Sequence, residues 1–481
     1  MTRTAAIIGG GVIGGGWAAR FRLMGWNVRV FDPDPEAERK LGEVLANARR
    51  SLPGLHEVAL PPEGEMTRHA SAAEAATGAD FVVESVPERL DIKHKVYAEI
   101  QAANPGVIIG SSTSGYKPSD LAAAAAQPGN IVVTHPFNPV YLLPLVELVP
   151  SATTPPDVID RAKDVLTGIG MYPLHVRAEI DAHIADRFLE AVWREALWLI
   201  KDGVATTEEI DDAIRYGFGI RWAQMGLFET YRIAGGEAGM RHFIAQFGPC
   251  LSWPWTKLMD VPDLTEDLID AIADQSDAQS GKFTIRELER IRDNNLVAMM
   301  RALKAQDWGA GKLLRAQDDA LGRAELDITR PIVTVDRAVP LDWTDYNGHM
   351  NEARYLHAFG DATDRFMEIV GVDAECIAAG MSCFTAETHI RHLGEVHAGA
   401  RIRVTTQLLE GRGKRMHLWH EMRVGEALVA TGEHMVLHVD LATRRASEPT
   451  PQVAARVAEI AAAHAGLPKP EGAGRAVGQP R

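Results

Sequence analysis

A serine, a histidine and a glutamate stand in two segments of the chain, and side chains of these types can carry out acid–base chemistry on an alcohol. Ser114 lies in GSSTSGYKPSDL, and His135 and Glu147 lie in VVTHPFNPVYLLPLVELV. A neutral imidazole that titrates near neutrality can accept the hydroxyl proton that is lost as hydride leaves a secondary alcohol. Glu147 could hold the imidazole tautomer and stabilise the imidazolium, while Ser114 could position the substrate oxygen. A buried structural histidine with a glutamate partner is the alternative.

A glycine-rich loop near the N-terminus could bind the phosphates of a dinucleotide. Gly9, Gly11 and Gly14 follow the strand-like run TAAII and precede a helical stretch. Such glycines permit a tight turn, a close approach of the backbone to the pyrophosphate, and helix packing, with the pyrophosphate at the helix N-terminus. The residues expected to contact the cofactor are Gly9, Gly10, Gly11, Val12, Ile13 and Gly14. Asp32 ends the second predicted strand, where its carboxylate could bind ribose hydroxyls and repel a 2′-phosphate, so NAD is expected rather than NADP.

Short β-rich runs alternate with helical stretches through residues 1–178. The runs are TAAIIG, NVRVFD, ADFVVES, GVIIGSS, NIVVTHPF, LVELVP and YPLHV. Strands that are separated by helices indicate a parallel sheet built from right-handed βαβ units. This segment is therefore expected to be an α/β Rossmann-type domain that binds NAD.

The pattern changes twice after that domain, as expected for a chain too long for one core. Residues 179–328 lack strand runs, and HIADRFLEAVWREALWLIKDG has helical spacing with Gly203 as a C-cap, which predicts an all-helical domain. Residues 329–450 contain one helix after Asn351 and then a series of antiparallel strands, which predicts an α+β domain with a sheet wrapped around a helix. Residues 451–481 form a predicted tail, with a short Ala-rich helix and a disordered Pro/Gly-rich end.

Composition excludes several classes of function. Hydrophobic residues make up 46% of the chain and charged residues 24%, as in ordinary globular proteins. A net charge of −15 argues against nucleic acid or an anionic membrane as a partner. Cys250, Cys376 and Cys383 show neither metal-ligand spacing nor a pairing pattern, so no metal site is expected. No basic segment leads into an apolar signal core, and no apolar run is long enough to span a membrane, so a cytoplasmic location is expected.

The Ser114, His135 and Glu147 segments, including the HPFNP motif, resemble the 3-hydroxyacyl-CoA dehydrogenase family. The resemblance covers residues 4 to about 320, and it implies that these three residues oxidise a hydroxyl group with NAD in a homodimeric enzyme. One position departs from the family pattern. The family usually continues into its helical domain with GFIxNR, whereas this chain reads AHIADRF, so Asp186 replaces an asparagine that helps to place the substrate. Asp186 is therefore a further candidate residue of the site.

An acidic side chain and nearby aromatic residues would suit a quaternary ammonium group, which has no N–H and is recognised only by negative charge and π-faces. The helical segment contains several aromatic residues that could serve this purpose: Trp193, Trp198, Trp222, Trp253, Trp255, Phe228 and Tyr231. Most of them are expected to be core or dimer contacts. With the run GFGIRWAQMGLFETYRIAGG, these features resemble the L-carnitine dehydrogenase branch of the family, which implies L-carnitine as substrate.

The segment WTDYNGHMNEARYLHAF resembles the start of the central helix in hot-dog thioesterases of the 4-hydroxybenzoyl-CoA type. The resemblance implies Asp345 as nucleophile or general base, and Gly348, His349 and Asn351 as the residues that bind the thioester. Backbone N–H groups at the helix N-terminus would polarise the carbonyl. Asn351 suits an N-cap position equally well. Hot-dog sites usually form between two protomers, which again implies a homodimer.

The two halves together resemble a bifunctional family that joins an L-carnitine dehydrogenase to a betainyl-CoA thioesterase. The implied route oxidises L-carnitine to 3-dehydrocarnitine, uses another enzyme to form betainyl-CoA from it and acetyl-CoA, and hydrolyses betainyl-CoA to glycine betaine and CoA. Two alternatives stay open. The chain could be a 3-hydroxyacyl-CoA dehydrogenase with a thioesterase for its own acyl-CoA products. It could also be a carnitine dehydrogenase whose hot-dog domain is catalytically silent and serves dimerisation.

Overall fold

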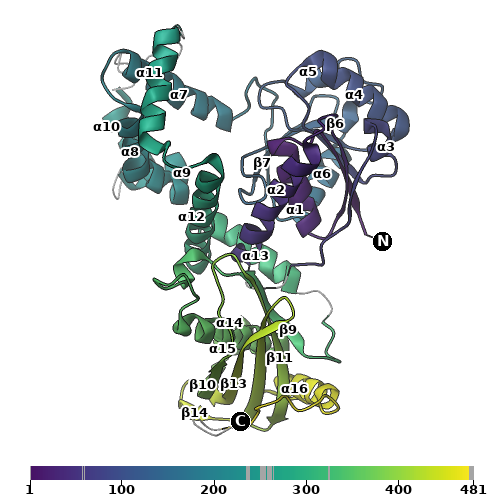
Figure 1. Cartoon of the computed structure of the whole chain (residues 1–481), viewed down its shortest axis with the longest axis vertical. Helices are drawn as coiled ribbons and strands as arrows, with labels where there is room; N and C mark the ends of the chain where they lie inside the picture. The colour runs from purple at the N-terminus through teal and green to yellow at the C-terminus, as the bar shows by residue number, and fades with distance from the viewer. Residues whose placement is uncertain are drawn as a thin grey trace. The chain divides into compact units, whose positions relative to one another are not determined.

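The computed structural model describes residues 2–56, 58, 60–234, 239–249, 256, 263, 265–322 and 326–475. The chain divides into two compact units, which are coloured by residue number in Figure 1. The first unit comprises Met1–Leu45 and Glu63–Arg315, and the second comprises Ala46–Pro62 and Ala316–Arg481. None of the helices in the described ranges combines the length and the apolar character needed to cross a bilayer.

The first unit contains an eight-stranded sheet with the order β3-β2-β1-β4-β5-β6-β7-β8. Its strands are β1 (Thr4–Ile8), β2 (Asn27–Phe31), β3 (Met66–Arg68), β4 (Phe81–Glu84), β5 (Ile109–Ser111), β6 (Ile131–Pro136), β7 (Leu145–Val149) and β8 (Tyr172–His175). All seven predicted runs form strands. β3 was not predicted, because it has only three residues and two of them are polar.

Helices between the strands pack on this sheet. They are α1 (Val12–Leu23), α2 (Ala37–Ser51), α3 (Ala72–Ala76), α4 (Leu90–Ala103), α5 (Pro118–Ala122) and α6 (Pro156–Gly168). Two 3-10 turns also occur in this part of the chain, η1 (Leu52–Leu55), which belongs to the second unit, and η2 (Pro128–Asn130). Apolar residues of the central strands, including Ile7, Ile8 and Val82, are fully buried. Burial of both sheet faces explains why these strands read as continuous apolar runs.

One pair of strands departs from the predicted parallel sheet. β6 and β7 are antiparallel, whereas β7 and β8 are parallel again. A parallel connection needs a crossover, usually a helix, and the short segment between β6 and β7 contains none. The antiparallel register places His135 directly opposite Glu147.

The predicted all-helical segment is confirmed over its described residues. Its helices are α7 (Ala185–Lys201), α8 (Thr207–Ala213), α9 (Gly219–Ala234), α10 (Gly239–Phe247), α11 (Glu266–Ser280), α12 (Ile285–Ala305) and α13 (Ala310–Gly322), with a π-helical turn η3 (Ile214–Phe218) between α8 and α9. Gly203 has a positive φ of 68° just after α7, and its N–H donates to the carbonyl of Ile200. The predicted glycine at this helix end is thus confirmed.

The second unit contains an antiparallel sheet with the order β10-β13-β12-β11-β9, and β14 pairs with β13. The elements are β9 (Ile332–Ala338), η6 (Leu341–Trp343), α14 (Glu352–Val370), α15 (Ala374–Ala378), β10 (Met381–His392), β11 (Arg401–Arg412), β12 (Arg415–Val424), β13 (Ala427–Asp440) and β14 (Arg445–Ala446). Helix α14 buries Tyr355, Phe359 and Phe366 and contacts β9, β11, β12 and β13. The predicted helix and antiparallel sheet are confirmed.

The C-terminal segment is more closely integrated than the predicted tail. Helix α16 (Pro451–His464) packs Val453 and Ile460 into a core shared with the sheet. Beyond it, the N–H of Gly474 donates to the carboxylate of Glu433 at 2.8 Å. The prediction of disorder is therefore wrong for residues 465–475, because backbone groups there hydrogen-bond to strand residues. Residues 476–481, which the same prediction covered, lie outside the described residues.

Candidate active site

His135 and Glu147 form a buried pair across β6 and β7. The Nδ1 atom of His135 lies 2.9 Å from Oε2 of Glu147. Directly opposed residues of an antiparallel pair place their side chains on the same face of the sheet, which accounts for this contact. A carboxylate on Nδ1 keeps the proton there and leaves Nε2 free to accept another.

Glu147 is held by the start of helix α7 as well. Its Oε1 atom accepts the backbone N–H groups of Ile184 and Ala185, each at 2.9 Å. Burial alone would raise the pKa of Glu147, but the hydrogen bonds from His135 and from these two N–H groups outweigh burial and hold the pKa below its usual value. Glu147 therefore stays ionised and orients the imidazole.

Asp186 faces the other nitrogen of the same histidine. Its Oδ2 atom lies 3.8 Å from Nε2 of His135, and 22% of its side chain is exposed. The pKa of Asp186 is raised above its usual value, mainly because the carboxyl group is partly buried. The charge of Glu147 also raises this pKa, whereas the nearby His135 lowers it. The structure thus brings together three of the four residues predicted for the dehydrogenase site.

Ser114 is the fourth predicted residue, and its side chain is exposed in the segment after β5. No hydrogen bond joins it to His135 or Asp186 in the described part of the chain. The adjacent Thr113 is buried, and its hydroxyl donates to Glu88. A role for Ser114 toward the substrate oxygen stays a prediction.

Two residues beside His135 were not identified from the sequence. The ring of Phe137 lies 4.8 Å from that of His135 in an edge-on arrangement. His183 is fully buried with its ring centre 5.7 Å from that of His135, and it adopts a positive φ of 50°. Burial and the proximity of His135 lower the pKa of His183, so it stays uncharged near neutrality. Phe137 belongs to the HPFNP motif, which could have drawn attention to it.

The aromatic residues of the helical segment do not gather around Asp186 in the described structure. Trp193 and Phe228 are exposed, Trp198 stacks under the ammonium of Lys201 at 4.3 Å, and Tyr231 stacks on a neighbouring phenylalanine. Trp222 lies against Phe218, with the two rings tilted and their centres 4.6 Å apart. Trp253 and Trp255 lie outside the described residues. Phe137 is therefore the aromatic ring that the structure places next to the site.

The glycine-rich loop between β1 and α1 fits a dinucleotide. Gly9 has a positive φ of 97°, and a Cβ atom on Gly14 would lie 1.7 Å from the carbonyl oxygen of Gly9. A Cβ on Gly11 would meet nothing within 4 Å, and the start of α1 has no side-chain cap. First-turn N–H groups lack partners within a helix, so this end can receive an anion. Val12 and Ile13 open that turn.

Asp32 follows β2 beside the loop. Its carboxylate accepts the N–H of Gly10 at 2.5 Å and that of Asp34 at 2.8 Å. The side chain stays partly exposed, which leaves it accessible to the hydroxyls of a ribose. Loop and carboxylate together form the arrangement that was predicted from their spacing.

A buried ion pair near this loop was also missed in the sequence. Glu84 at the end of β4 accepts hydrogen bonds from Lys93 at 2.8 Å, from the Tyr97 hydroxyl at 2.5 Å and from the Ser111 hydroxyl at 2.7 Å. Burial and the charge of Glu84 raise the pKa of Tyr97 well above its usual value. From the sequence, the run ADFVVES indicates only a strand, because the residues that hydrogen-bond to Glu84 lie in other elements.

Asp345 lies in a tight turn before α14 in the second unit. Its Oδ1 atom accepts the N–H groups of Asn347 and His349, at 2.9 and 3.2 Å. Gly348 has a positive φ of 78°, which a glycine adopts without strain. Asn351 caps α14, since its Oδ1 accepts the N–H of Ala353 at 2.9 Å. The capping interpretation of Asn351 is confirmed, and its role toward a thioester stays a prediction.

Three family models match the chain. Residues 4–180 match the NAD binding domain of 3-hydroxyacyl-CoA dehydrogenase, and residues 183–262 match the C-terminal domain of the same enzyme. Residues 339–457 match the thioesterase-like superfamily. The first unit therefore contains an NAD-binding dehydrogenase, and the second contains a thioesterase-like domain.

Three relatives illustrate the comparison. A dehydrogenase of 5-formyl-3-hydroxy-2-methylpyridine 4-carboxylic acid, described as an NAD-dependent dismutase, has a solved structure with 28% identity and a TM-score of 0.54, covering 63% of this chain and 99% of its own. An L-carnitine dehydrogenase of Pseudomonas putida is 51% identical over 64% of this chain and 96% of its own length. An L-carnitine dehydrogenase/betainyl-CoA thioesterase of Ruegeria pomeroyi is 70% identical over 99% of both chains. The chain therefore belongs to the family of L-carnitine dehydrogenase/betainyl-CoA thioesterases.

Proposed function

We propose that the chain oxidises L-carnitine to 3-dehydrocarnitine with NAD and hydrolyses betainyl-CoA to glycine betaine and CoA. The observation that carries this proposal is the 70% identity to a relative of that name over 99% of both chains. The identity spans both units, so it covers the dehydrogenase and the thioesterase together.

The dehydrogenase step depends on proton transfer to His135. Its Nε2 atom accepts the proton of the substrate hydroxyl, while Nδ1–H donates to Glu147. Glu147 is itself fixed by two backbone N–H groups and stabilises the imidazolium that forms. NAD, when bound at the glycine-rich loop, supplies the acceptor for the hydride that leaves the carbon. Ser114 contributes a hydroxyl that positions the substrate oxygen.

Asp186 distinguishes this site from one that binds an uncharged 3-hydroxy acid. A carboxylate near His135 attracts a trimethylammonium group, whose cation offers no N–H for a directional bond. The neighbouring ring of Phe137 provides an aromatic face beside the same histidine. Asp186 and Phe137 together are the cation-recognising pair in this proposal.

The thioesterase step uses the turn that precedes α14. Asp345 acts as nucleophile or as the base that removes a proton from water during its attack on the thioester carbonyl. The N–H groups at the start of α14, next to Gly348 and His349, stabilise the oxyanion that develops. The sulfur of CoA then leaves and takes up a proton. Glycine betaine is the carboxylate product.

Substrate comparison tests both halves. NADH formation should be faster with L-carnitine than with 3-hydroxybutyryl-CoA at equal concentration, and thiol release should be faster from betainyl-CoA than from acetyl-CoA. A preference for 3-hydroxybutyryl-CoA would support the acyl-CoA dehydrogenase alternative. Absence of thiol release with an active dehydrogenase would mean that the second unit is catalytically silent.

The proposal includes a cytoplasmic homodimer. Helix α7 exposes Phe188, Leu189 and Trp193 on neighbouring positions of one face, with more than half of each side chain exposed. Exposed apolar patches of this kind mark interfaces. Sedimentation of the wild type and of Leu189→Glu tests this, since a charge in the interface should shift a dimer toward monomer.

A further inference from the structure

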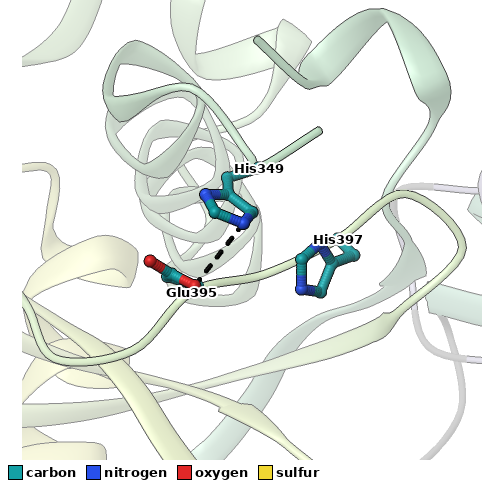
Figure 2. Close-up of side chains that lie close together, drawn as sticks. All are labelled: His349, Glu395 and His397. Atoms are coloured by element: carbon teal, nitrogen blue, oxygen red, sulfur yellow. Dashed lines mark ion pairs between the residues drawn. The ribbon is translucent and has the colours of Figure 1, made fainter. Parts of the chain in front are cut away.

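Three potential metal ligands gather at the turn before α14. His349 comes from that turn, while Glu395 and His397 come from the segment between β10 and β11, and Figure 2 shows their side chains close together. One ligand atom of each residue lies within 4.8 Å of the others. Nε2 of His349 is 3.5 Å from Oε2 of Glu395, and the two imidazole rings are 4.8 Å apart.

The backbone holds this cluster in place. His349 and His397 form an antiparallel β-bridge, and the N–H of Met350 donates to the carbonyl of Val396 at 2.7 Å. Two segments that are remote in sequence are thereby fixed side by side. A site whose ligands stand on a fixed backbone needs less reorganisation on binding an ion.

The hydrogen bonding of His397 prepares one nitrogen for coordination. Its Nδ1 atom lies 3.2 Å from the carbonyl oxygen of Gly348. A carbonyl can only accept, so Nδ1 carries the proton in this contact and Nε2 of the neutral ring keeps its lone pair. Metal-binding histidines commonly have such an outer partner, which fixes the tautomer and the ring orientation.

The alternative is an exposed ion pair between His349 and Glu395. Such a pair contributes little, because 71% of the Glu395 side chain is exposed and water screens it. An ion pair also gives no role to the second imidazole. Two imidazoles and one carboxylate are, by contrast, a known ligand set for zinc, and three protein ligands leave a fourth position for water.

We propose that His349, Glu395 and His397 form a binding site for a divalent transition metal of the Zn²⁺ type. The sequence predicts no metal here, because His349 is separated from the other two ligands by α14 and β10 and no local spacing signals the site. The site adjoins the thioesterase turn, since the backbone N–H of His349 donates to Asp345.

Cobalt titration of the full chain tests the site. The protein is produced without a polyhistidine tag and treated with a chelator, and Co²⁺ uptake is followed by its visible ligand-field absorption. Wild type should bind one equivalent, and Zn²⁺ should displace the cobalt. His397→Ala and Glu395→Gln should each weaken binding at least about tenfold, the scale expected even for loss of an outer partner.

A matched control is His69→Ala. His69 lies on the other unit, where its Nε2 contacts the Thr67 hydroxyl at 3.0 Å, so its loss should leave cobalt uptake unchanged. Circular dichroism checks that each variant is folded, and the exposed Glu395→Gln variant perturbs packing least. Absence of uptake by the wild type would overturn the proposal. Equal uptake by wild type, Glu395→Gln and His397→Ala would overturn it as well.

Discussion

His135 lies between two carboxylates that act on different nitrogens. Glu147 contacts Nδ1 at 2.9 Å, and Asp186 lies 3.8 Å from Nε2. Only Nε2 can face a substrate, since Nδ1 is occupied within the sheet. Substitution of Glu147 should therefore alter the orientation of the imidazole, whereas substitution of Asp186 should alter the surroundings of the nitrogen that faces the substrate.

Replacing His135 by alanine should abolish alcohol oxidation without affecting the nucleotide. The base acts in the chemical step, and removing a general base typically costs on the order of 10²–10⁴ in rate. The glycine-rich loop is formed by β1 and α1, so NAD affinity should stay within a few-fold of wild type. Steady-state NADH formation and fluorescence titration with NAD measure the two effects. Near wild-type turnover would reject the assignment of His135.

Replacing Asp186 by asparagine should raise the KM for L-carnitine about tenfold, which corresponds to ~1.4 kcal/mol. The asparagine keeps the size of the side chain and removes the charge that attracts the trimethylammonium. A neutral 3-hydroxy acid of similar size serves as the control substrate and should be affected less. Equal effects on both substrates would mean that Asp186 orients groups and does not sense charge.

The pH dependence separates two roles of Asp186. Burial raises its pKa, so the carboxylate takes up a proton at a higher pH than an ordinary aspartate does. On acidification, the KM of the wild type for L-carnitine should therefore begin to rise at a higher pH than the one at which exposed carboxylates take up protons. In the Asp186→Asn variant this rise should be absent. If the variant instead shifts the pH profile of kcat, Asp186 acts mainly on His135.

The antiparallel pair β6 and β7 positions the two residues that we propose for proton transfer in the dehydrogenase. Their register sets His135 opposite Glu147, and the N-terminus of α7 then supplies two N–H groups to the same carboxylate. His135 and Glu147 could be identified from the sequence because their spacing and the HPFNP motif are distinctive. The antiparallel pairing of their strands could not be predicted, since alternating strands and helices predict parallel neighbours throughout.

The same limit applies to the residues that the sequence did not reveal. Strand runs and the long amphipathic helices were predictable, because their periodicity is a local property of the chain. Glu84 and His183 gain their environments from partners in other elements, and those partners have no fixed sequence spacing. Helix α16 was recognised as a helix, but its packing on the sheet depends on residues in β11 and α14.

A buried histidine pair beneath α14 should make the thioesterase domain sensitive to acid. His420 and His434 both contact the hydroxyl of Thr363, at 3.2 and 3.1 Å. Burial lowers the pKa of His434 to about 4 and that of His420 further below its usual value. The unfolded chain therefore binds more protons than the folded one below the usual histidine pKa, so stability falls as pH decreases in that range.

The variant His434→Gln tests this sensitivity, because glutamine is polar but does not titrate. Between about pH 7.5 and about pH 5, the wild type should lose roughly 2 kcal/mol more stability than the variant. Urea-induced loss of thioesterase activity at the two pH values measures the difference. The comparison uses the change with pH, so any constant destabilisation by the substitution cancels. Equal losses in both proteins would show that His434 does not couple to folding.

The second unit includes a segment from the N-terminal part of the chain. Residues Ala46–Pro62 belong to it, and within this segment η1 contacts β9. Leu52 and Leu55 of η1 are fully buried, and Nδ1 of the buried His56 lies 2.6 Å from Oδ1 of Asp318. The thioesterase-like unit is therefore built partly from residues that interrupt the dehydrogenase sequence.

Two variants distinguish separate chemistry from shared structure. Asp345→Ala should abolish betainyl-CoA hydrolysis and leave carnitine oxidation intact, because Asp345 lies in the second unit, where its carboxylate accepts N–H groups of its own turn. Truncation before Ile332 should impair both reactions. It removes β9 and exposes the apolar side chains of η1, and each fully buried leucine contributes ~1.5–3 kcal/mol.

Both reactions are assayed on both variants, with thermal unfolding as a check on folding. We expect the truncated chain to unfold at a lower temperature and to lose NADH formation at temperatures where the full chain stays active, because each ~1.4 kcal/mol of lost stabilisation lowers the folding equilibrium constant tenfold. A folded Asp345→Ala protein that also lost carnitine oxidation would contradict separate sites. A truncated chain with full dehydrogenase activity and unchanged thermal stability would contradict the dependence of carnitine oxidation on the residues from Ile332 onward.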